Sequence, residues 1–438
     1  MAAALILLVF LVFAALMYTR TMPALLAVPL MAVVMALAAG VPAPGLASIV
    51  LDGAPALAKV IVTLIFGAML GRVTLDTGIA RAIVNAAAEF GGESPAAVAF
   101  AMCVIVALLF VSLQGLGAII MVGTIVLPVM MTTGVPRKIA ATLFLMAFAL
   151  GFIFNPFIWQ FYTKFFGITQ GQLTTYAAVL AAIDALAMLV YAFVSFRSLR
   201  AYATWAVKAE ERGRERIFAP ALLTPILPII LFYALHLDPI LAFAISAIYG
   251  AACTKPRAAI QVLVAAAIRG VEDVAPAVLL FIGIGMLATA VKQPQFAAAL
   301  QPIASWPGLR SPVAFVVLFG LLSPLVLYRG PLNPFGVGIA IFTVLLAAHA
   351  LPAIVLVAAM MAVVQVQNVC DPTNTQNVWV ANFTGVHIDE ITKRTLPFQV
   401  AVATVACIAV AAFAGPMFGT RAFASLIPPA AAAQMQPG

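Results

Sequence analysis

The chain has 438 residues, of which 65% are hydrophobic and only 8% charged, and its net charge is +8. A soluble domain carries roughly 25% charged residues, so this composition excludes an ordinary water-facing surface and predicts one integral membrane domain. The basic residues stand singly at the ends of apolar runs, which is the pattern of membrane topology signals rather than of a nucleic-acid-binding face.

Apolar runs separated by charged residues, Gly and Pro give the elements of the first half. Three spans are predicted first, at Ala3–Tyr18, Met22–Gly40 and Ala56–Thr74. The first run lacks a basic n-region and a small-residue cleavage site, so we expect a retained span and no signal peptide. Gly78–Phe90 is amphipathic but too short and polar to cross, and it is predicted to lie in the membrane interface.

The next run, Ala96–Gly134, is too long for one span. At 1.5 Å per residue a single helix of this length would exceed a bilayer of about 30 Å. Its weak point is Ser112–Gly117, so the run is either two full spans with a minimal turn or a re-entrant hairpin. Next comes a broken span, in which Asn155-Pro156 separates Arg137–Phe154 from Phe157–Gly167. A long span, Leu173–Phe196, closes the half.

The second half follows a charge-rich linker, Arg200–Arg216, which the positive-inside rule places in the cytoplasm. Its predicted elements are two spans, a basic amphipathic stretch, a span, an interfacial piece, a long broken run, a span leading into a polar break, and a last span. They are Pro220–Leu237, Pro239–Cys253, Pro256–Gly270, Val274–Val291, Gln293–Ser305, Val313–Ala350 with its break at Tyr328–Gly336, Pro352–Asn368 with the break Asp371–Asn377, and Phe398–Ala414.

The two halves share this order of elements and some residues at fixed spacing. Asn155-Pro156 and Gln160 recur as Asp371-Pro372 and Gln376 after an offset of 216 (371 − 155; 376 − 160). We therefore predict a first repeat at residues 1–199, a cytoplasmic linker at 200–217, a second repeat at 218–418 and a disordered tail at 419–438.

Charge placement predicts that the repeats are inverted. Arg72, Arg137 and Lys138 can all be cytoplasmic only if Ala96–Gly134 enters and leaves by the same side. The basic residues of the second half are also cytoplasmic if Val313–Ala350 dips in from outside. The predicted fold is an all-α polytopic membrane protein of two inverted-topology repeats, each with a re-entrant helical hairpin and a broken helix, an architecture typical of secondary transporters.

The breaks predict a central site. Unwound backbone in hydrocarbon survives only inside protein or beside a water-filled cavity, since each unpaired N–H or C=O group costs several kcal/mol. Glycines, half-helix N-termini and uncharged amide and hydroxyl groups at the breaks suit an anionic substrate and a small cation. The predicted substrate-binding residues are Ser112, Gln114, Gly115, Gly117, Asn155, Arg329, Asn333, Thr373, Asn374 and Thr375, and the predicted ion-coupling residues are Asn155, Gln160, Asp371 and Gln376.

Three charged residues have a second interpretation. Arg329 either clamps a carboxylate at the second hairpin tip or extends to the outer membrane surface. A carboxylate at the midplane costs about 2.5–3.5 kcal/mol, so Asp371 either binds the coupling ion or proton, or caps a helix at a membrane edge. Asp184, midway along Leu173–Phe196, either makes a structural hydrogen bond or relays protons.

At these residues the sequence resembles the ion transporter superfamily, and within it the citrate–metal–proton symporter family. The stretches LVFAALMYTRTMPAL, VSLQGLGAIIMVGTIVLPVMMTTGVP and DPTNTQNVWVANFTGVHIDEITKRTLPF carry the resemblance. It implies a scaffold domain and a mobile transport domain, an elevator-like mechanism, a homodimer, and uptake of a di- or tricarboxylate with protons or sodium. Where that family has an acidic residue and a run of hydroxyls, this chain has Gln114 and Ala118-Ile119-Ile120, so the expectation is limited to an organic anion.

The expected function is therefore secondary active transport of a small organic anion, a di- or tricarboxylate, across the bacterial inner membrane. The coupling ion is a proton or sodium ion, and no other cofactor and no metal site is expected. The alternative is a sodium/proton antiporter that uses Asp371 and Asp184. An enzyme is not expected, since no HExxH, GxSxG, paired catalytic carboxylates or cofactor loop occurs. The expected partners are the lipid bilayer and a second copy of the chain.

Overall fold

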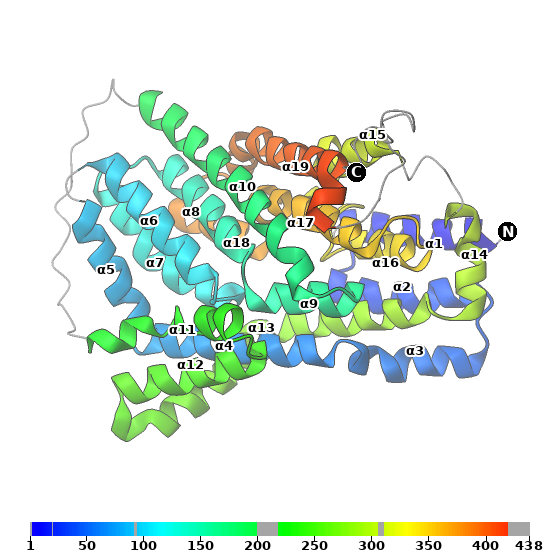
Figure 1. The fold of residues 1–438 in the computed structure, drawn as a ribbon, viewed down its shortest axis with the longest axis horizontal. Helices are drawn as coiled ribbons and strands as arrows, with labels where there is room; N and C mark the ends of the chain where they lie inside the picture. Colours follow the sequence, from blue (N-terminus) through cyan, green and yellow to red (C-terminus); the bar gives the residue numbers. More distant parts are fainter. Residues whose placement is uncertain (1, 20, 92–93, 199–217, 305–310, 419–438) are drawn as a thin grey trace, which may run out of the picture.

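In a computed structural model, the described residues are 2–19, 21–91, 94–198, 218–304 and 311–418, and every regular element in these ranges is helical (Figure 1). A helix pairs its own backbone groups, which is what a chain without water around it requires. Seven helices are long and apolar enough to cross a membrane, or eight if one bent pair counts as a span. This confirms the prediction of an all-α polytopic membrane protein.

The first half contains ten helices in its described part. Their bounds are α1 Ala2–Tyr18, α2 Ala24–Ala38, α3 Ala43–Ala56, α4 Ala58–Asp76, α5 Ile79–Gly91, α6 Pro95–Phe110, α7 Gly115–Thr132, α8 Arg137–Phe152, α9 Pro156–Phe166 and α10 Gln170–Ser198. The breaks expected at Ser112–Gly117 and Asn155-Pro156 are both present, and α8 and α9 meet at an angle of 53°. The third span begins earlier than expected, because α3 and α4 form one apolar segment from Ala43 to Asp76.

The second half contains shorter and less regular pieces. Their bounds are η2 Ala219–Leu223, α11 Leu227–Ile229, η3 Ile230–Ala234, α12 Pro239–Thr254, η4 Pro256–Ala258, α13 Ala259–Ala290, α14 Pro294–Ala304, α15 Pro312–Phe315, η6 Val316–Leu321, η7 Ser323–Arg329, α16 Gly338–Ala347, α17 Ala353–Cys370, α18 Thr375–Thr384 and α19 Ile388–Phe418. The breaks expected at Tyr328–Gly336 and Asp371–Asn377 are again present, although α18 already begins at Thr375.

Three predicted elements have different forms in the structure. Pro220–Leu237 is not one regular span but a 3₁₀ turn, a short α-turn and a π-turn. Three prolines in this stretch remove backbone donors, so a regular helix cannot run through it. The amphipathic stretch Pro256–Gly270 and the span Val274–Val291 are instead one 32-residue helix, α13.

Charge pairing explains why α13 is continuous. Arg72 of α4 binds Asp273 of α13 through Nε–Oδ2 (2.6 Å) and Nη2–Oδ1 (2.5 Å). One turn away, Arg269 of α13 lies 3.3 Å from Asp76 of α4. The charged residues that suggested a break in the sequence are therefore neutralised by reciprocal pairs between two antiparallel helices.

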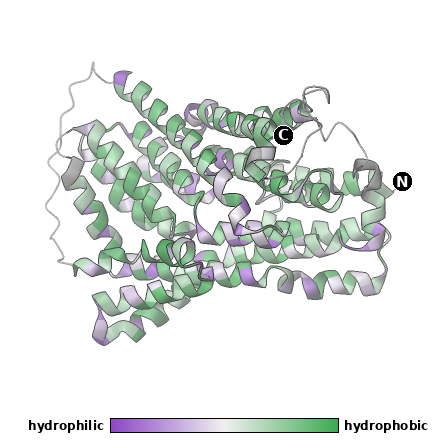
Figure 2. Cartoon of the chain, viewed as in Figure 1, coloured by the Kyte–Doolittle hydropathy of each residue, from purple (hydrophilic) through white to green (hydrophobic). Residues whose placement is uncertain are grey.

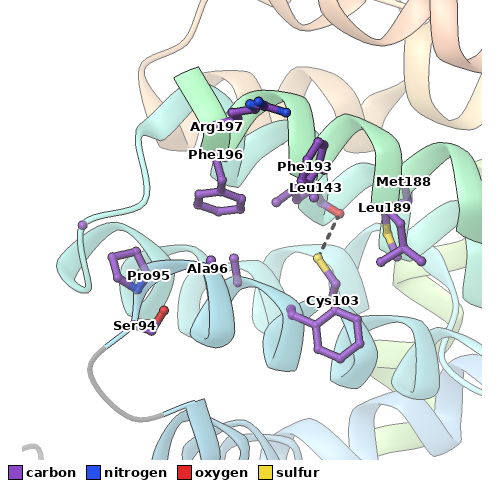
Figure 3. Close-up of a pocket in the computed structure, with 14 residues that line it drawn as sticks. Ser94, Pro95, Ala96, Cys103, Leu143, Met188, Leu189, Phe193, Phe196 and Arg197 are labelled. Carbon is purple, nitrogen blue, oxygen red and sulfur yellow. Dashed lines mark hydrogen bonds between the residues drawn. The ribbon is translucent and has the colours of Figure 1, made fainter. Parts of the chain in front are cut away.

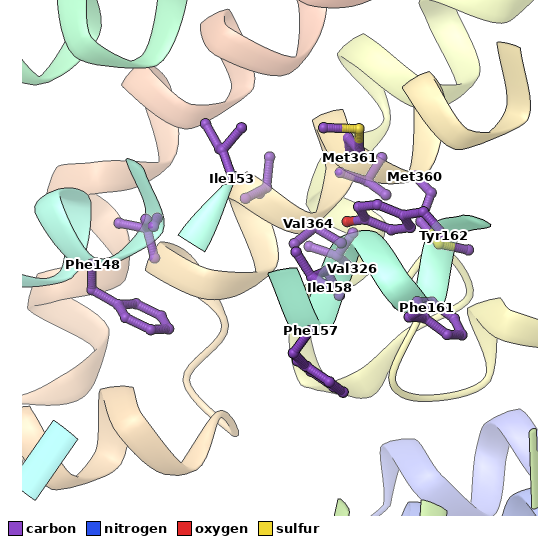
Figure 4. Close-up of a cluster of buried hydrophobic side chains, with 14 of the residues drawn as sticks. Phe148, Ile153, Phe157, Ile158, Phe161, Tyr162, Val326, Met360, Met361 and Val364 are labelled. Atoms are coloured by element: carbon purple, nitrogen blue, oxygen red, sulfur yellow. The ribbon is translucent and has the colours of Figure 1, made fainter. Parts of the chain in front are cut away.

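The core of the molecule is built around α17, whose residues from Ile354 to Cys370 are all buried. A helix that is apolar on every side is stable only inside a bundle, and α8, α9, α18 and α19 pack around it. Figure 4 shows aromatic and aliphatic side chains of α8 and α9 lying with Val326 and with the methionines of α17. Hydrophobic residues cover most of the helices, and hydrophilic ones gather at helix ends and in the middle of the molecule (Figure 2).

The predicted linker at 200–217 and the predicted tail at 419–438 lie outside the described residues. The relation between the halves as inverted repeats stays a prediction, as do the interfacial positions of α5 and α14.

Candidate functional site

The first break is held open by two buried amides. Gly115 begins α7 at φ +85°, a conformation that favours glycine. The preceding Gln114 donates from Nε2 to the Leu64 carbonyl of α4 at 2.7 Å. A Cβ at Gly67 would overlap the Gln114 amide, so this glycine makes room for it. Ser112, also buried, bonds back to the Leu109 carbonyl of its own helix.

Asn155 ties the first break to the step between α8 and α9. Its Nδ2 donates to the carbonyls of Phe110 (3.1 Å) and Leu113 (3.0 Å), and its Oδ1 accepts the Phe157 N–H at 3.0 Å. These bonds satisfy carbonyls at the end of α6 and an N–H at the start of α9, which helical bonding leaves unpaired. Asn155 is fully buried, and its side-chain Nδ2 and Oδ1 both form hydrogen bonds within the protein.

The second broken run turns at Tyr328 and Arg329, which both have positive φ (56° and 60°). Asn333 holds this turn: Nδ2 donates to the Val326 carbonyl and to Asp371 Oδ2, both at 3.0 Å, and Oδ1 accepts the Phe335 N–H. Arg329 Nη1 donates to the Phe335 carbonyl at 3.0 Å.

Asp371 joins this turn to the break between α17 and α18. Its Oδ1 accepts from the backbone N–H of Tyr328 (3.0 Å) and from the N–H and hydroxyl of Thr373 (2.9 and 2.7 Å), and its Oδ2 accepts from Asn333. These four donors hold a fully buried carboxylate at the junction of the two breaks. The predicted coupling role of Asp371 stays a prediction.

Three of the breaks contribute lining residues to one cavity of about 640 Å³, and the remaining break, Asn155-Pro156, is flanked by the lining residues Phe152 and Phe157. Seven of the predicted site residues line it: Gln114, Gly115, Arg329, Thr373, Asn374, Thr375 and Gln376. The other predicted residues do not line it. Ser112, Asn155, Asn333 and Asp371 are buried in its supporting wall, Gly117 packs against the Asp273 carboxylate, and Gln160 is buried on α9.

The cavity wall combines polar side chains of the breaks with aromatic side chains. The aromatic lining residues are Phe148, Phe152, Phe157, Phe281 and Phe335. Among the described lining residues Arg329 is the only cation, and Asp273 is the only acid. Both Asp273 oxygens already bind Arg72. Arg329, in contrast, donates to a backbone carbonyl and has no hydrogen bond to an acidic side chain among the described residues.

Sequence reasoning missed three polar residues of this site. Asp273 was not singled out, although Arg72 and Asp76 on one run and Arg269 and Asp273 on another share a spacing of four residues. Gln367 and Asn368 of α17 also line the cavity, and within the described residues Gln367 Oε1 and Asn368 Nδ2 have no hydrogen-bond partner. Three amides on an otherwise apolar run, Gln365, Gln367 and Asn368, were the available signal.

A second cavity, of about 750 Å³, lies between α6, α8 and α10. Figure 3 shows its mostly apolar lining, with Cys103 directed at the Leu143 carbonyl 3.9 Å away. Arg197 stacks over Phe193 at 5.7 Å. The cavity contains none of the predicted site residues and no converging polar groups among its described lining residues, so it is not the candidate site.

No protein-family model matches the chain, and no curated protein matches it. Its structure is similar to that of the YdaH transporter of Alcanivorax borkumensis, with a TM-score of 0.60 and 14% identity over 86% of this chain and 90% of that one. It is also similar to MtrF of Neisseria gonorrhoeae, described among antimetabolite efflux pumps, with a TM-score of 0.52 and 12% identity over 85% and 84% of the two chains. Neither result supports the citrate–metal–proton symporter family in particular. The chain therefore shares its helical membrane fold with two transporters.

Proposed function

We propose that the chain is a secondary active transporter that moves a small organic anion, a di- or tricarboxylate, across the inner membrane with protons or sodium ions. The observation that carries this proposal is that three chain breaks line one cavity and residues beside the remaining break, Asn155-Pro156, line it as well. Broken helices around a central cavity are the way transporter folds build a substrate site, and the fold shared with YdaH and MtrF supports the same class.

The charge of the cavity supports an anion. Arg329 presents a guanidinium, which suits a carboxylate. The first residues of α7 and α18, Gly115 and Thr375, also line the cavity, so the positive dipole ends of two helices lie at its wall. The amides and hydroxyls of the fourth break add neutral donors.

The bonds of Asp371 support a route from ion binding to the substrate site. Its carboxylate bonds the Tyr328 N–H and Asn333, which belong to the same turn as Arg329. Protonation or cation binding at Asp371 would weaken these acceptor bonds and free the turn that carries the cavity's cation. We propose that this exchange couples the ion to the substrate within an inverted-repeat, elevator-type homodimer.

Transport by purified protein in proteoliposomes tests the proposal. Labelled succinate, citrate and a monocarboxylate are offered with proton or sodium gradients, and counterflow of at least one anion is expected. Arg329→Gln should raise KM for that anion by about 10- to 100-fold, the value of one charge-assisted hydrogen bond of about 1.5–3 kcal/mol. Lys393→Gln, at an exposed cation on α19, is the matched control and should stay within about twofold of wild type.

Asp371→Asn tests the coupling separately. The variant should still exchange anion across the membrane but should not accumulate it against a gradient. Its new amide would face the Asn333 amide, so the double variant Asn333→Asp/Asp371→Asn restores a donor–acceptor pair and controls for folding. Accumulation by Asp371→Asn would remove the coupling role, and movement of sodium ions against protons without any anion would instead indicate an antiporter.

A further inference from the structure

A buried carboxyl group lies away from the cavity, at the contact between α10 and α19. Asp184 is fully buried, and its Oδ1 accepts from Gln399 Nε2 at 2.9 Å. Gln399 is also fully buried. In the described part of the protein, Asp184 Oδ2 and Gln399 Oε1 have no hydrogen-bond partner.

The surroundings of Asp184 offer no described cation to balance a negative charge. The elements that pack closely against α10 are α8, α17 and α19. Their buried titratable groups are the thiols of Cys370 and Cys407, and Cys370 lies 3.2 Å from the Thr395 hydroxyl. Their charged residues are at the helix ends and not fully buried: Arg137, Lys138, Asp389, Glu390, Lys393 and Arg394. On α10 itself, buried Tyr176 donates to the Ala358 carbonyl, and Tyr191 packs edge-on against Phe398.

The two fully buried carboxyl groups of the described residues differ in their hydrogen-bond donors. Asp371 accepts four hydrogen bonds, whereas Asp184 accepts one. An isolated buried carboxylate with so few donors is strongly disfavoured relative to the neutral acid. Protonation would turn Oδ2 into a donor, and Gln399 Oε1 is the unpaired acceptor on the same partner side chain.

We propose that Asp184 and Gln399 form a proton-binding site outside the substrate cavity, in which the neutral carboxylic acid pairs with the amide through both of its oxygens. The proton lies on Asp184 Oδ2 and is donated to Gln399 Oε1, while Oδ1 accepts from Nε2. Loss of the proton leaves two acceptors and a negative charge between α10 and α19, so the packing of these helices depends on pH. This inference does not rest on the transport proposal.

Infrared difference spectroscopy of the purified protein tests the site directly. At neutral pH, wild type should show a carbonyl band of a protonated carboxylic acid that is absent from Asp184→Asn. Asp371→Asn is the matched control, because Asp371 is the other fully buried acid among the described residues, and it should leave the band unchanged. Absence of the band from wild type, or its persistence in Asp184→Asn, would overturn the proposal.

A second variant keeps the test decisive if Asp184→Asn does not fold. Gln399→Leu removes the amide but keeps the acid, so the band should remain and move in frequency as its hydrogen bond is lost; an unmoved band would contradict the pairing. Thermal unfolding gives an independent result. Because the folded state holds a proton here, wild-type stability should fall as pH rises, and Asp184→Asn should lack this component.

Discussion

Asn155 and Asp371 occupy corresponding positions in the two halves of the chain, but one side chain donates hydrogen bonds where the other accepts them. Each precedes a proline, and each accepts the N–H two residues later, from Phe157 and Thr373. Each also reaches back to a preceding break, but Asn155 donates to carbonyls there, whereas Asp371 accepts from donors. The offset of 216 thus has a matching local geometry, and the choice of Asn or Asp follows the partner groups.

Asn155→Asp should destabilise the protein, because a carboxylate would replace the amide donor opposite two carbonyl oxygens. Two carbonyls lose their partner at about 1–3 kcal/mol each, so an overall loss of about 3 kcal/mol is expected in unfolding experiments in detergent. Asn382→Asp, at an exposed asparagine on α18, is the control and should change stability by no more than about 0.5 kcal/mol. Equal effects of the two variants would show that the Asn155 bonds contribute little.

The pairing of α4 with α13 explains why α13 is one helix, although the sequence predicts two separate elements at Pro256–Gly270 and Val274–Val291. Charged residues near residue 270 suggested that an apolar run ended there, but their partners lie about 200 residues earlier in the chain. Ion pairs between remote helices cannot be read from a local hydropathy pattern. The prolines of Pro220–Leu237 were visible in the sequence, and they should have excluded a regular span on local grounds alone.

The Arg72–Asp273 pair should be worth more than an exposed pair. Its side chains are 20% and 16% exposed, so Asp273→Asn, which leaves the guanidinium half-buried without its carboxylate, should cost about 2 kcal/mol. The reversed pair Arg72→Asp/Asp273→Arg should recover part of this loss. For comparison, Glu390→Gln breaks the contact with Lys138, in which the Glu390 side chain is 33% and the Lys138 side chain 50% exposed, and it should cost less than Asp273→Asn because solvent screens the pair. Thermal shift measurements that rank the two pairs in the opposite order would refute this assignment.

At the scale of the whole molecule, the inverted relation between the halves makes a prediction about sidedness. The segments that precede α8 and α17 should face opposite sides of the membrane, with the α8 side in the cytoplasm. Lys138→Cys and Ala348→Cys, in a Cys253→Ser background, should be labelled by a membrane-impermeant thiol reagent from opposite sides. The other three native cysteines are buried. Labelling of both from one side would mean that the halves are not inverted.

The sequence by itself determined the membrane class, most of the helices and the four chain breaks, because composition and Gly and Pro placement act locally and lipid leaves helices as the available structure for such runs. Only the tertiary structure decided that the breaks border one cavity, that Asp371 is bound by four donors while Asp184 has one, and that Asp273 is neutralised by Arg72. These features depend on side chains that are far apart in the chain and meet only when helices pack, and no local pattern records which partner each will find.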